Sequence, residues 1–492
     1  MIDSHGYITS RSALRNLSRR QMLQMSGLGL GSLALTTLLD SQGLLAAERG
    51  TTGQRSLGLD SNPSHFSAQA KSVIMFMQNG GPGQMEFFDP KPELTKRDGQ
   101  TYDTSVEKFQ PGNSDQLLKS PFKFHRHGQC GMELSEIIPH IGSVADEICL
   151  VRSMVSEHNN HTEALVLLNT GKIFQGRPAL GSWISYALGT DNQNLPAYIV
   201  LRDPAGYNTS GTLLWQNGWL PALYRGTEVN TQGTPILNMK SKTPRPIQRR
   251  NLDFLAQLNE RHREDFPNDS VLETRIRNYE LAARMQLAAS ETLDLSRENK
   301  ATQELYGLDN PVTSSYGLRC LMARRLVESG VRFVQIFPSK GQPWDSHTNV
   351  KSQNESISAE TDLPSAALIK DLKQRGLLES TLVIWSGEFG RLPVSQNGTG
   401  RDHNRNAFSL FLAGAGFKSG FIYGKTDDVG YRAVENRVTV HDLHATILHQ
   451  LGFDHKRLTY RLHGNEETLT DSRVTDARLV GDLLIKAPQV SV

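Results

Sequence analysis

Several short segments of the sequence are predominantly apolar, and each is followed by a polar stretch rich in glycine or asparagine. They cover residues 73–77, 330–337, 381–385 and 408–413. A run that is apolar almost throughout is typical of a strand buried on both faces, as in a parallel sheet covered by helices. Amphipathic, helix-like segments lie between them, among them 181–188, 314–329 and 362–375. We therefore predict an α/β fold with a mainly parallel central sheet, helices on both faces, and insertions.

The remaining segments fit this alternation with some irregular additions. We expect further strands at 147–154 and 196–201, a helix at 133–141, and a long charged helical region at 249–295. Residues 95–128 show little periodicity and are interpreted as an insertion. Residues 203–245, rich in glycine, asparagine, proline and tryptophan, are interpreted as an ordered surface excursion.

The N-terminus has the pattern of an export signal. Arg19 and Arg20 precede a weakly apolar, glycine-rich run at 25–39 and small residues near 44–47. A basic region followed by a short apolar region predicts a signal peptide, and the arginine pair indicates the twin-arginine export machinery. The apolar run is shorter than the ~20 residues that a membrane span needs. A short amphipathic helix or a lipid-facing anchor is the alternative interpretation.

The expected organisation follows from this leader. Residues 1–47 are predicted to be the twin-arginine signal peptide, 48–68 a linker, and 69–492 a single domain. We expect an exported protein, periplasmic or at the cell surface, with no stable membrane span in its mature form. The cleavage position stays open because Leu45 is a poor match to a small-residue cleavage site.

Charge and cysteine content exclude two classes of function. With 53 basic and 51 acidic residues the net charge is +2, which gives no support for nucleic-acid binding. The three cysteines show no C-x-x-C spacing, so neither a disulfide framework nor a thiolate metal site is expected.

Acidic and histidine side chains cluster after two of the predicted strands. Glu388 follows the strand at 381–385, with Asp402 and His403 shortly after it, and Asp345 and His347 follow the strand at 330–337. The carboxyl ends of parallel strands meet at one edge of a sheet, so these side chains are candidates for one site.

Two other loops are candidates for the same edge. The first strand ends in 78–83, where Asn79 precedes a Gly-Gly-Pro turn that either binds an anion through its amides or is an ordinary turn. The segment 156–163 places two histidines, two acids and Thr162 at the start of a helix. Imidazoles at a helix N-terminus can bind a metal or a phosphate- or sulfate-like group; the alternative is a capping segment with solvated histidines.

The linked motifs resemble a known family. These are the arginine-pair leader, the Gly-Gly-Pro loop, Phe-Asp-Pro-Lys-Pro at 88–92, Trp-Asp-Ser-His at 344–347, Gly-Glu-Phe-Gly-Arg at 387–391 and Gly-Arg-Asp-His at 400–403. Together they resemble the exported domain-of-unknown-function-1501 family, whose members are sulfatase-like proteins of the alkaline phosphatase/sulfatase superfamily. The segments 377–386 and 440–448 also resemble that superfamily's approach to a metal ligand and its final helix.

The resemblance implies roles for particular residues. Asp345, His347 and His403 fall where one divalent metal is bound, with Asp402 as a partner that orients His403. Glu388 falls at or near a second metal position, as ligand or base. His161 and Thr162 stand at the nucleophile position, and His161 is alternatively a metal ligand.

The sequence also departs from the superfamily pattern. Asn79 stands where the superfamily has a metal-binding Asp, so a second metal site would need rebuilding, with Asp89 or the 157–163 loop as candidates. There is no Cys-x-Pro-x-Arg motif, which excludes formylglycine chemistry.

The resemblance therefore implies an exported metal-dependent hydrolase of sulfate or phosphate esters, or of related anionic esters. Its cofactor would be a divalent metal (Zn, Ca or Mg), and its substrate an anionic ester or a sulfated glycan. The alternative is a catalytically degenerate relative that binds glycans or serves as a structural component of the cell surface.

Overall fold

The computed structural model describes residues 61–233, 235–236, 243–266, 269–288 and 292–486. The predicted signal peptide and most of the predicted linker lie outside the described residues. The chain divides into two compact units, one made of residues 55–460 and 467–492, the other of residues 1–54 and 461–466. In the larger unit, a nine-stranded sheet forms the centre.

The strand order of this sheet is β14-β5-β13-β9-β1-β8-β6-β7, with β17 also paired to β5. Its strands are β1 (Ser72–Met77), β5 (Ile148–Val155), β6 (Tyr198–Leu201), β7 (Thr227–Glu228), β8 (Phe333–Ile336), β9 (Thr381–Ser386), β13 (Phe408–Ala413), β14 (Phe421–Tyr423) and β17 (Val438–Thr439). The central strands β1, β8, β9 and β13 are buried at every position, as their apolar sequences predict.

Strand β13 is the exception to a parallel sheet. It pairs antiparallel with both β5 and β9, whereas the other strand pairs of this sheet are parallel. Because β13 runs in the opposite direction, the residues before it lie at the edge where β1, β5, β8 and β9 end. Residue 403, which precedes β13, therefore reaches the same edge as residues that follow the other strands.

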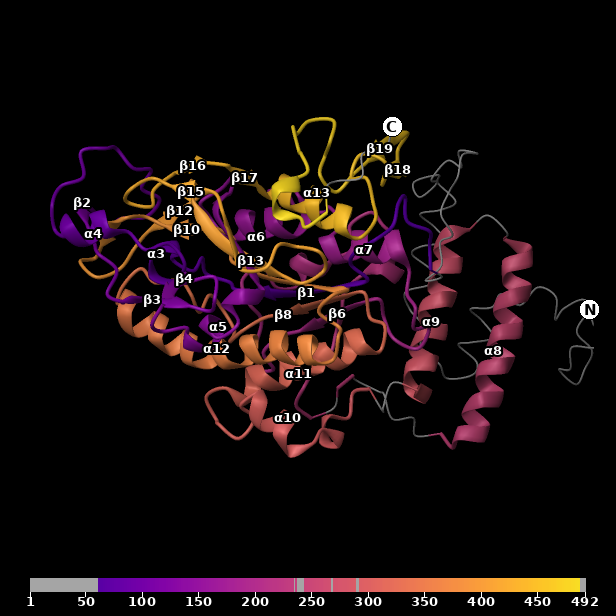
Figure 1. The fold of residues 1–492 in the computed structure, drawn as a ribbon. Helices are drawn as coiled ribbons and strands as arrows, with labels where there is room; N and C mark the ends of the chain where they lie inside the picture. The colour runs from indigo at the N-terminus through magenta and orange to yellow at the C-terminus, as the bar shows by residue number, and fades with distance from the viewer. Residues whose placement is uncertain (1–60, 234, 237–242, 267–268, 289–291, 487–492) are drawn as a thin grey trace, which may run out of the picture. The chain divides into compact units, whose positions relative to one another are not determined.

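Helices cover both faces of this sheet (Figure 1). Helices α11 and α12 lie on one face, where α11 contacts β1 and β8. Helices α6, α7 and α13 lie on the other, where α7 contacts β6 and β8. These helices are α6 (His161–Thr170), α7 (Leu180–Leu188), α11 (Ser314–Glu328), α12 (Val350–Gln374) and α13 (Val440–Gln450). The predicted α/β fold with a mainly parallel sheet and helices on both faces is confirmed.

Smaller elements surround the sheet. The other helices are α3 (Gln84–Phe87), α4 (Pro92–Lys96), α5 (Pro139–Gly142), α8 (Arg245–Asp265), α9 (Ser270–Ala288) and α10 (Lys300–Leu305). The other strands form two-stranded pairs: β2 (Asn113–Leu117) with β11 (Val394–Gln396), β3 (Phe124–His127) with β4 (Met132–Ser135), β10 (Gly390–Arg391) with β12 (His403–Asn404), β15 (Lys425–Thr426) with β16 (Ala433–Glu435), and β18 (Tyr460–Leu462) with β19 (Asn465–Glu467).

Some local predictions differ from the structure. The helix predicted at 133–141 is wrong: strand β4 takes its start and only the single turn α5 follows, beginning at Pro139. The helical region 249–295 consists of two helices, α8 and α9. The helix predicted at 362–375 begins earlier, at Val350. Within the described residues, none of the helices is long and apolar enough to cross a membrane.

Candidate metal centre

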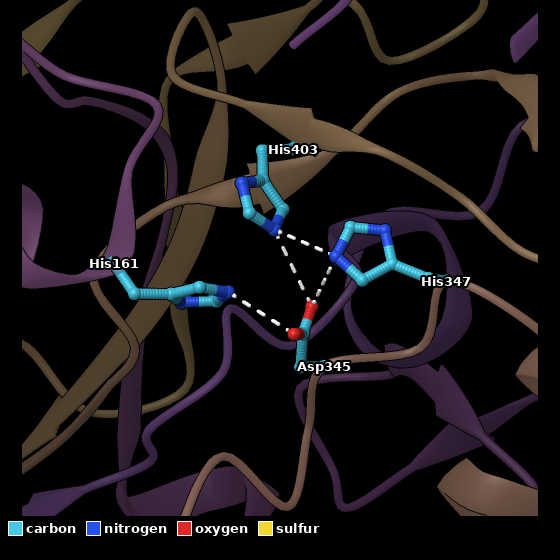
Figure 2. A group of neighbouring side chains, drawn as sticks. All are labelled: His161, Asp345, His347 and His403. Atoms are coloured by element: carbon cyan, nitrogen blue, oxygen red, sulfur yellow. Dashed lines mark hydrogen bonds and ion pairs between the residues drawn. The ribbon is translucent and has the colours of Figure 1, made fainter. Parts of the chain in front are cut away.

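Four side chains from three loops at this edge of the sheet converge on one point. They are His161, Asp345, His347 and His403, and each offers one ligand atom within 4.8 Å of the others. Figure 2 shows the three imidazoles arranged around the Asp345 carboxylate. The structure thus brings together the three residues expected to bind one metal and adds His161, the residue for which a ligand role was the alternative.

The local fold explains how each side chain reaches this point. His161 is the first residue of α6, and the loop 156–160 connects it to β5, which ends at Val155. Asp345 and His347 follow β8, and His403 opens the short strand β12, which pairs with β10 after β9. All of these segments lie at the edge of the sheet where β1, β5, β8 and β9 end and where β13 begins.

Close backbone packing fixes two of the loops. At Gly80, which has φ of +113°, an added Cβ would lie 2.6 Å from the backbone nitrogen of Asp345. At Gly400, an added Cβ would lie 1.9 Å from the carbonyl oxygen of His347. Only glycine allows the loops to approach so closely, and this is the physical reason for glycine in both motifs.

The distances within the cluster suit a small metal ion. His347 Nε2 lies 2.9 Å from Asp345 Oδ1, and His403 Nε2 lies 3.4 Å from the same oxygen. His161 Nε2 lies 3.3 Å from Asp345 Oδ2. Two ligands bound tetrahedrally at zinc-like bond lengths of about 2.0–2.1 Å would be about 3.3–3.4 Å apart.

Each imidazole is held through its other ring nitrogen. His161 Nδ1 lies 2.6 Å from Glu388 Oε1, His347 Nδ1 lies 2.6 Å from Gln396 Oε1, and His403 Nδ1 lies 2.6 Å from the carbonyl oxygen of Asn159. The Gln396 amide is oriented by its own Nε2, which donates to the Pro111 carbonyl.

These three acceptors decide the tautomers. A carbonyl oxygen or a carboxylate cannot donate, so each Nδ1 carries the proton and each neutral ring presents its Nε2 lone pair to the centre. His403 Nε2 and His347 Nε2 are nevertheless only 3.0 Å apart, and the buried His161 Nε2 has no hydrogen-bond partner among the described residues. Converging lone pairs of this kind repel one another unless a cation or a proton lies between them. Metal-binding histidines are held through the second nitrogen in this way.

Electrostatics at the centre favour an ionised Asp345 carboxylate and a neutral His403 imidazole. Burial alone would raise the pKa of Asp345, but the three imidazoles and the buried guanidinium of Arg391 outweigh it and hold that pKa well below its ordinary value. Burial, supported by the charge of Arg391, lowers the pKa of His403 to about 4. His161 differs: burial lowers its pKa, but the neighbouring carboxylates of Asp345 and Glu388 outweigh burial and raise it.

Arg391 contacts the Asp345 carboxylate of this centre. Its Nη2 lies 2.6 Å from Asp345 Oδ1, and its other nitrogens donate to the carbonyl oxygens of Gly81 and Arg401. The side chain is fully buried, so it fixes Asp345 rather than contacting solvent. The sequence motif contains Arg391, but its role was not predicted.

Glu388 contacts the cluster through His161. In addition to His161, its oxygens accept hydrogen bonds from the backbone N–H groups of Gly80 (3.0 Å) and Gly81 (3.2 Å). The carboxylate is completely buried and is not among the four converging residues. In this arrangement Glu388 holds His161, one of the four candidate ligands, in place.

The other candidate residues lie around the cluster or away from it. Asp402 accepts from the backbone N–H of His403, and its second oxygen accepts from the backbone N–H of Phe109 (2.7 Å). It therefore fixes the backbone, while the Asn159 carbonyl orients the His403 ring. Asp89 contacts Lys91, Arg152 and Thr426, none of which belongs to the cluster.

Thr162 and Asn79 have less defined surroundings. Thr162 is half-buried in the first turn of α6, directly after His161. The side chain of Asn79 is fully buried at the end of β1, and neither its amide nitrogen nor its oxygen has a hydrogen-bond partner among the described residues.

The sequence of this chain matches the family model "Protein of unknown function (DUF1501)" over residues 70–484. The chain belongs to this family. Among curated proteins, no relative matches it.

Solved structures with a similar fold come from sulfatases, phosphatases and related enzymes. The lipoteichoic acid synthase LtaP from Listeria monocytogenes is 10% identical, with 84% of this chain and 78% of that chain covered and a TM-score of 0.34. The PsFucS1 sulfatase from Pseudoalteromonas sp. is 12% identical, with coverages of 78% and 68% and a TM-score of 0.32. TAB5 alkaline phosphatase is 12% identical, with coverages of 70% and 92% and a TM-score of 0.32. Likenesses at this level carry no argument about activity.

Proposed function

We propose that this member of the DUF1501 family is an exported, metal-dependent hydrolase of sulfate or phosphate esters, or of related anionic esters. The observation that supports it most directly is the convergence of three imidazole Nε2 atoms and one carboxylate, with each Nδ1 held by an acceptor that cannot donate. Imidazole and carboxylate ligands fit zinc, and other divalent ions such as Mg or Ca are alternatives.

The charges around the centre favour an anionic substrate. Among the charged side chains within the cluster or in contact with its side chains, Asp345 and Glu388 contribute two negative charges and Arg391 one positive charge, so a divalent cation would leave this set net positive. When bound, such an ion acts as a Lewis acid toward a phosphoryl or sulfuryl oxygen. The side chains of Asp345 and His347 are 17% and 20% exposed, so solvent and substrate reach the centre on their side.

The residues that react with the ester are assigned by elimination. His161 Nδ1 is held by Glu388, and its Nε2 lies 3.3 Å from Asp345 Oδ2 among the converging atoms, which favours a ligand role over a nucleophile role. Thr162 then remains the candidate nucleophile among the residues at this position. If so, Thr162→Ala abolishes turnover and leaves the metal content unchanged, whereas His161→Ala lowers both.

Metal analysis tests the first part of the proposal. Purified full-length protein, supplied with Zn²⁺ and desalted, is expected to retain about one ion per chain, and Asp345→Ala and His403→Ala are expected to lose it. His158→Ala is the matched control, because His158 lies three residues from His161 but outside the cluster. A wild-type protein that retains no metal contradicts the proposal.

Turnover is measured with a panel of phosphate monoesters, phosphate diesters and sulfated sugars. We expect hydrolysis that depends on metal and disappears in Asp345→Ala. The panel also identifies which anionic ester or sulfated glycan is the substrate.

One observation favours a second candidate function. The cluster already supplies four protein ligands, and four protein ligands are typical of structural zinc sites, whereas catalytic sites keep a position open. A catalytically degenerate protein that binds glycans or supports a surface assembly would retain the metal, lose thermal stability when the metal is removed, and hydrolyse none of the esters.

Export is a separate part of the proposal. It rests on the arginine pair and the short apolar run of the leader. Arg19→Lys combined with Arg20→Lys is expected to retain the protein in the cytoplasmic fraction of a bacterial host. Equal amounts of the wild type and this variant in the exported fraction would contradict it.

A further inference from the structure

A cavity of about 580 Å³ lies beside the edge strand β14, and none of the four metal-centre residues lines it. Its wall includes Asp89, Lys91, Arg152, Lys418, Phe421 and Tyr423. The cavity is therefore a separate feature of the molecule, and the proposed hydrolase chemistry does not use it.

Arg152 is incompletely paired at this cavity. Its side chain extends from β5 and is only 17% exposed. Its Nε lies 3.8 Å from Asp89 Oδ1, and neither Nε nor Nη2 has a hydrogen-bond acceptor among the described residues. Buried guanidinium N–H groups normally find acceptors, so these two donors indicate a binding position.

The nearest carboxylate, Asp89, is too far from Arg152 for a hydrogen bond and has closer partners. Asp89 Oδ1 lies 3.0 Å from Lys91 Nζ, whose side chain is 8% exposed, and Asp89 Oδ2 accepts from the Thr426 hydroxyl. Lys91 and Arg152 thus both face the Asp89 carboxylate. Burial lowers the pKa of Arg152. The negative charges of Asp89 and Glu133 act to raise it, but they do not outweigh burial.

The rest of the cavity adds a balanced rim and an aromatic wall. Lys418 and Lys425 are accompanied by Glu435 and Asp482, so the charges of this part of the lining balance. Lys418 Nζ lies 4.9 Å from the centre of the Phe421 ring, which belongs to β14.

We propose that this cavity is a second binding site, which takes the oxyanion group of a small polar ligand beside Arg152 and Lys91. The planar fork of Arg152 donates two hydrogen bonds to a sulfate, phosphate or carboxylate group, with Lys91 beside it. The aromatic wall of β14 contacts the remainder of the ligand.

Calorimetric titration of the full-length protein tests this assignment, with the wild type and Arg152→Gln metal-loaded and Asp345→Ala treated in the same way. Sulfate, phosphate and acetate are titrated in turn into the wild type, Arg152→Gln and Asp345→Ala. We expect saturable binding of at least one anion, retained in Asp345→Ala and weakened at least tenfold in Arg152→Gln. The anion that binds identifies the chemical class of the ligand.

Three results would overturn the proposal: no saturable binding of any of the three anions, equal binding by Arg152→Gln, or binding that is lost in Asp345→Ala but not in Arg152→Gln. The last result would assign the anion to the metal centre.

A second variant covers the case in which Arg152→Gln does not fold. Lys418→Glu reverses a rim charge without altering the buried pair and is expected to weaken anion binding several-fold. Lys351→Glu is the matched control, because Lys351 is 62% exposed on α12 and does not line the cavity. Equal affinities of the two variants would count against the proposed site.

Discussion

Replacing Glu388 by Gln tests whether the carboxylate behind His161 serves a metal ion. The change keeps the size of the side chain and removes its negative charge. Glu388 accepts from three donors: His161 Nδ1 at 2.6 Å and the backbone N–H groups of Gly80 and Gly81. Glutamine has one acceptor oxygen, so its NH₂ group must face one of these donors.

The expected magnitude follows from the outer position of Glu388. Loss of an outer partner of a metal-binding histidine typically weakens metal affinity about 10- to 100-fold. This corresponds to about 1.4 to 2.8 kcal/mol of binding free energy. We therefore expect the dissociation constant for Zn²⁺, measured by competition with a chelator of known affinity, to rise by one to two orders of magnitude in Glu388→Gln.

The control is Glu360→Gln. Glu360 lies on α12, accepts from Ser339 and pairs with Arg319, so it is a hydrogen-bonded, largely buried acid like Glu388, but it lies away from the cluster. Circular dichroism must show that both variants fold. A dissociation constant within about twofold of the wild type in Glu388→Gln would refute the assignment of Glu388 as the partner of a metal-bound histidine.

Three further predictions follow from the geometry. Gly400→Ala drives a Cβ against the His347 carbonyl, so metal retention and thermal stability are both expected to fall, as measured by metal content and calorimetry. Phe109 stacks on His403 with ring centres 5.3 Å apart and is 44% exposed, so Phe109→Ala is expected to speed metal removal by a chelator several-fold by opening the His403 side to water. Burial lowers the pKa of His444 to about 3 from 6.5, so the folded state resists its protonation and stability is lost as the pH falls from 6.5 towards 3. In urea unfolding, His444→Gln is expected to reduce the pH slope in this window by up to about 1.4 kcal/mol per pH unit.

Each of these predictions has a matched comparison. Gly206→Ala meets only the flexible side chain of Lys340 and is expected to behave as the wild type. Phe174→Ala removes an aromatic ring that is 70% exposed and is expected to leave the rate of metal removal unchanged. A pH slope in His444→Gln equal to that of the wild type would show that His444 is not buried as the neutral form.

The fold could be predicted because burial leaves a direct mark on the sequence. Strands β1, β9 and β13 lie between neighbours on both sides and under helices, so their side chains must be apolar on both faces. The helix predicted at 133–141 is wrong because the strand that begins this region is short. Strand β4 has four residues, Met132–Ser135, and pairs with β3 rather than with the central sheet, so its two buried apolar residues are too few to mark a strand period.

The candidate site could be predicted only in part. Asp345, His347 and His403 follow from residue type and from their position after strands. Their partners do not, because the Asn159 carbonyl has no side-chain signature and Gln396 is an ordinary residue of a strand. The direction of β13 was also not apparent from its sequence, since a strand buried on both faces is equally apolar whichever way it runs.

That reversed direction has a consequence for the order of folding. The ligands span residues 161 to 403, and the last of them takes its place only when β13 has inserted between β5 and β9. Contacts so distant in the chain form late, because a long loop must be closed before each is gained. The complete set of candidate ligands would therefore exist only in a chain whose sheet is already assembled. A metal ion would bind after that step and stabilise the folded state. Metal uptake during refolding should then lag behind formation of the sheet.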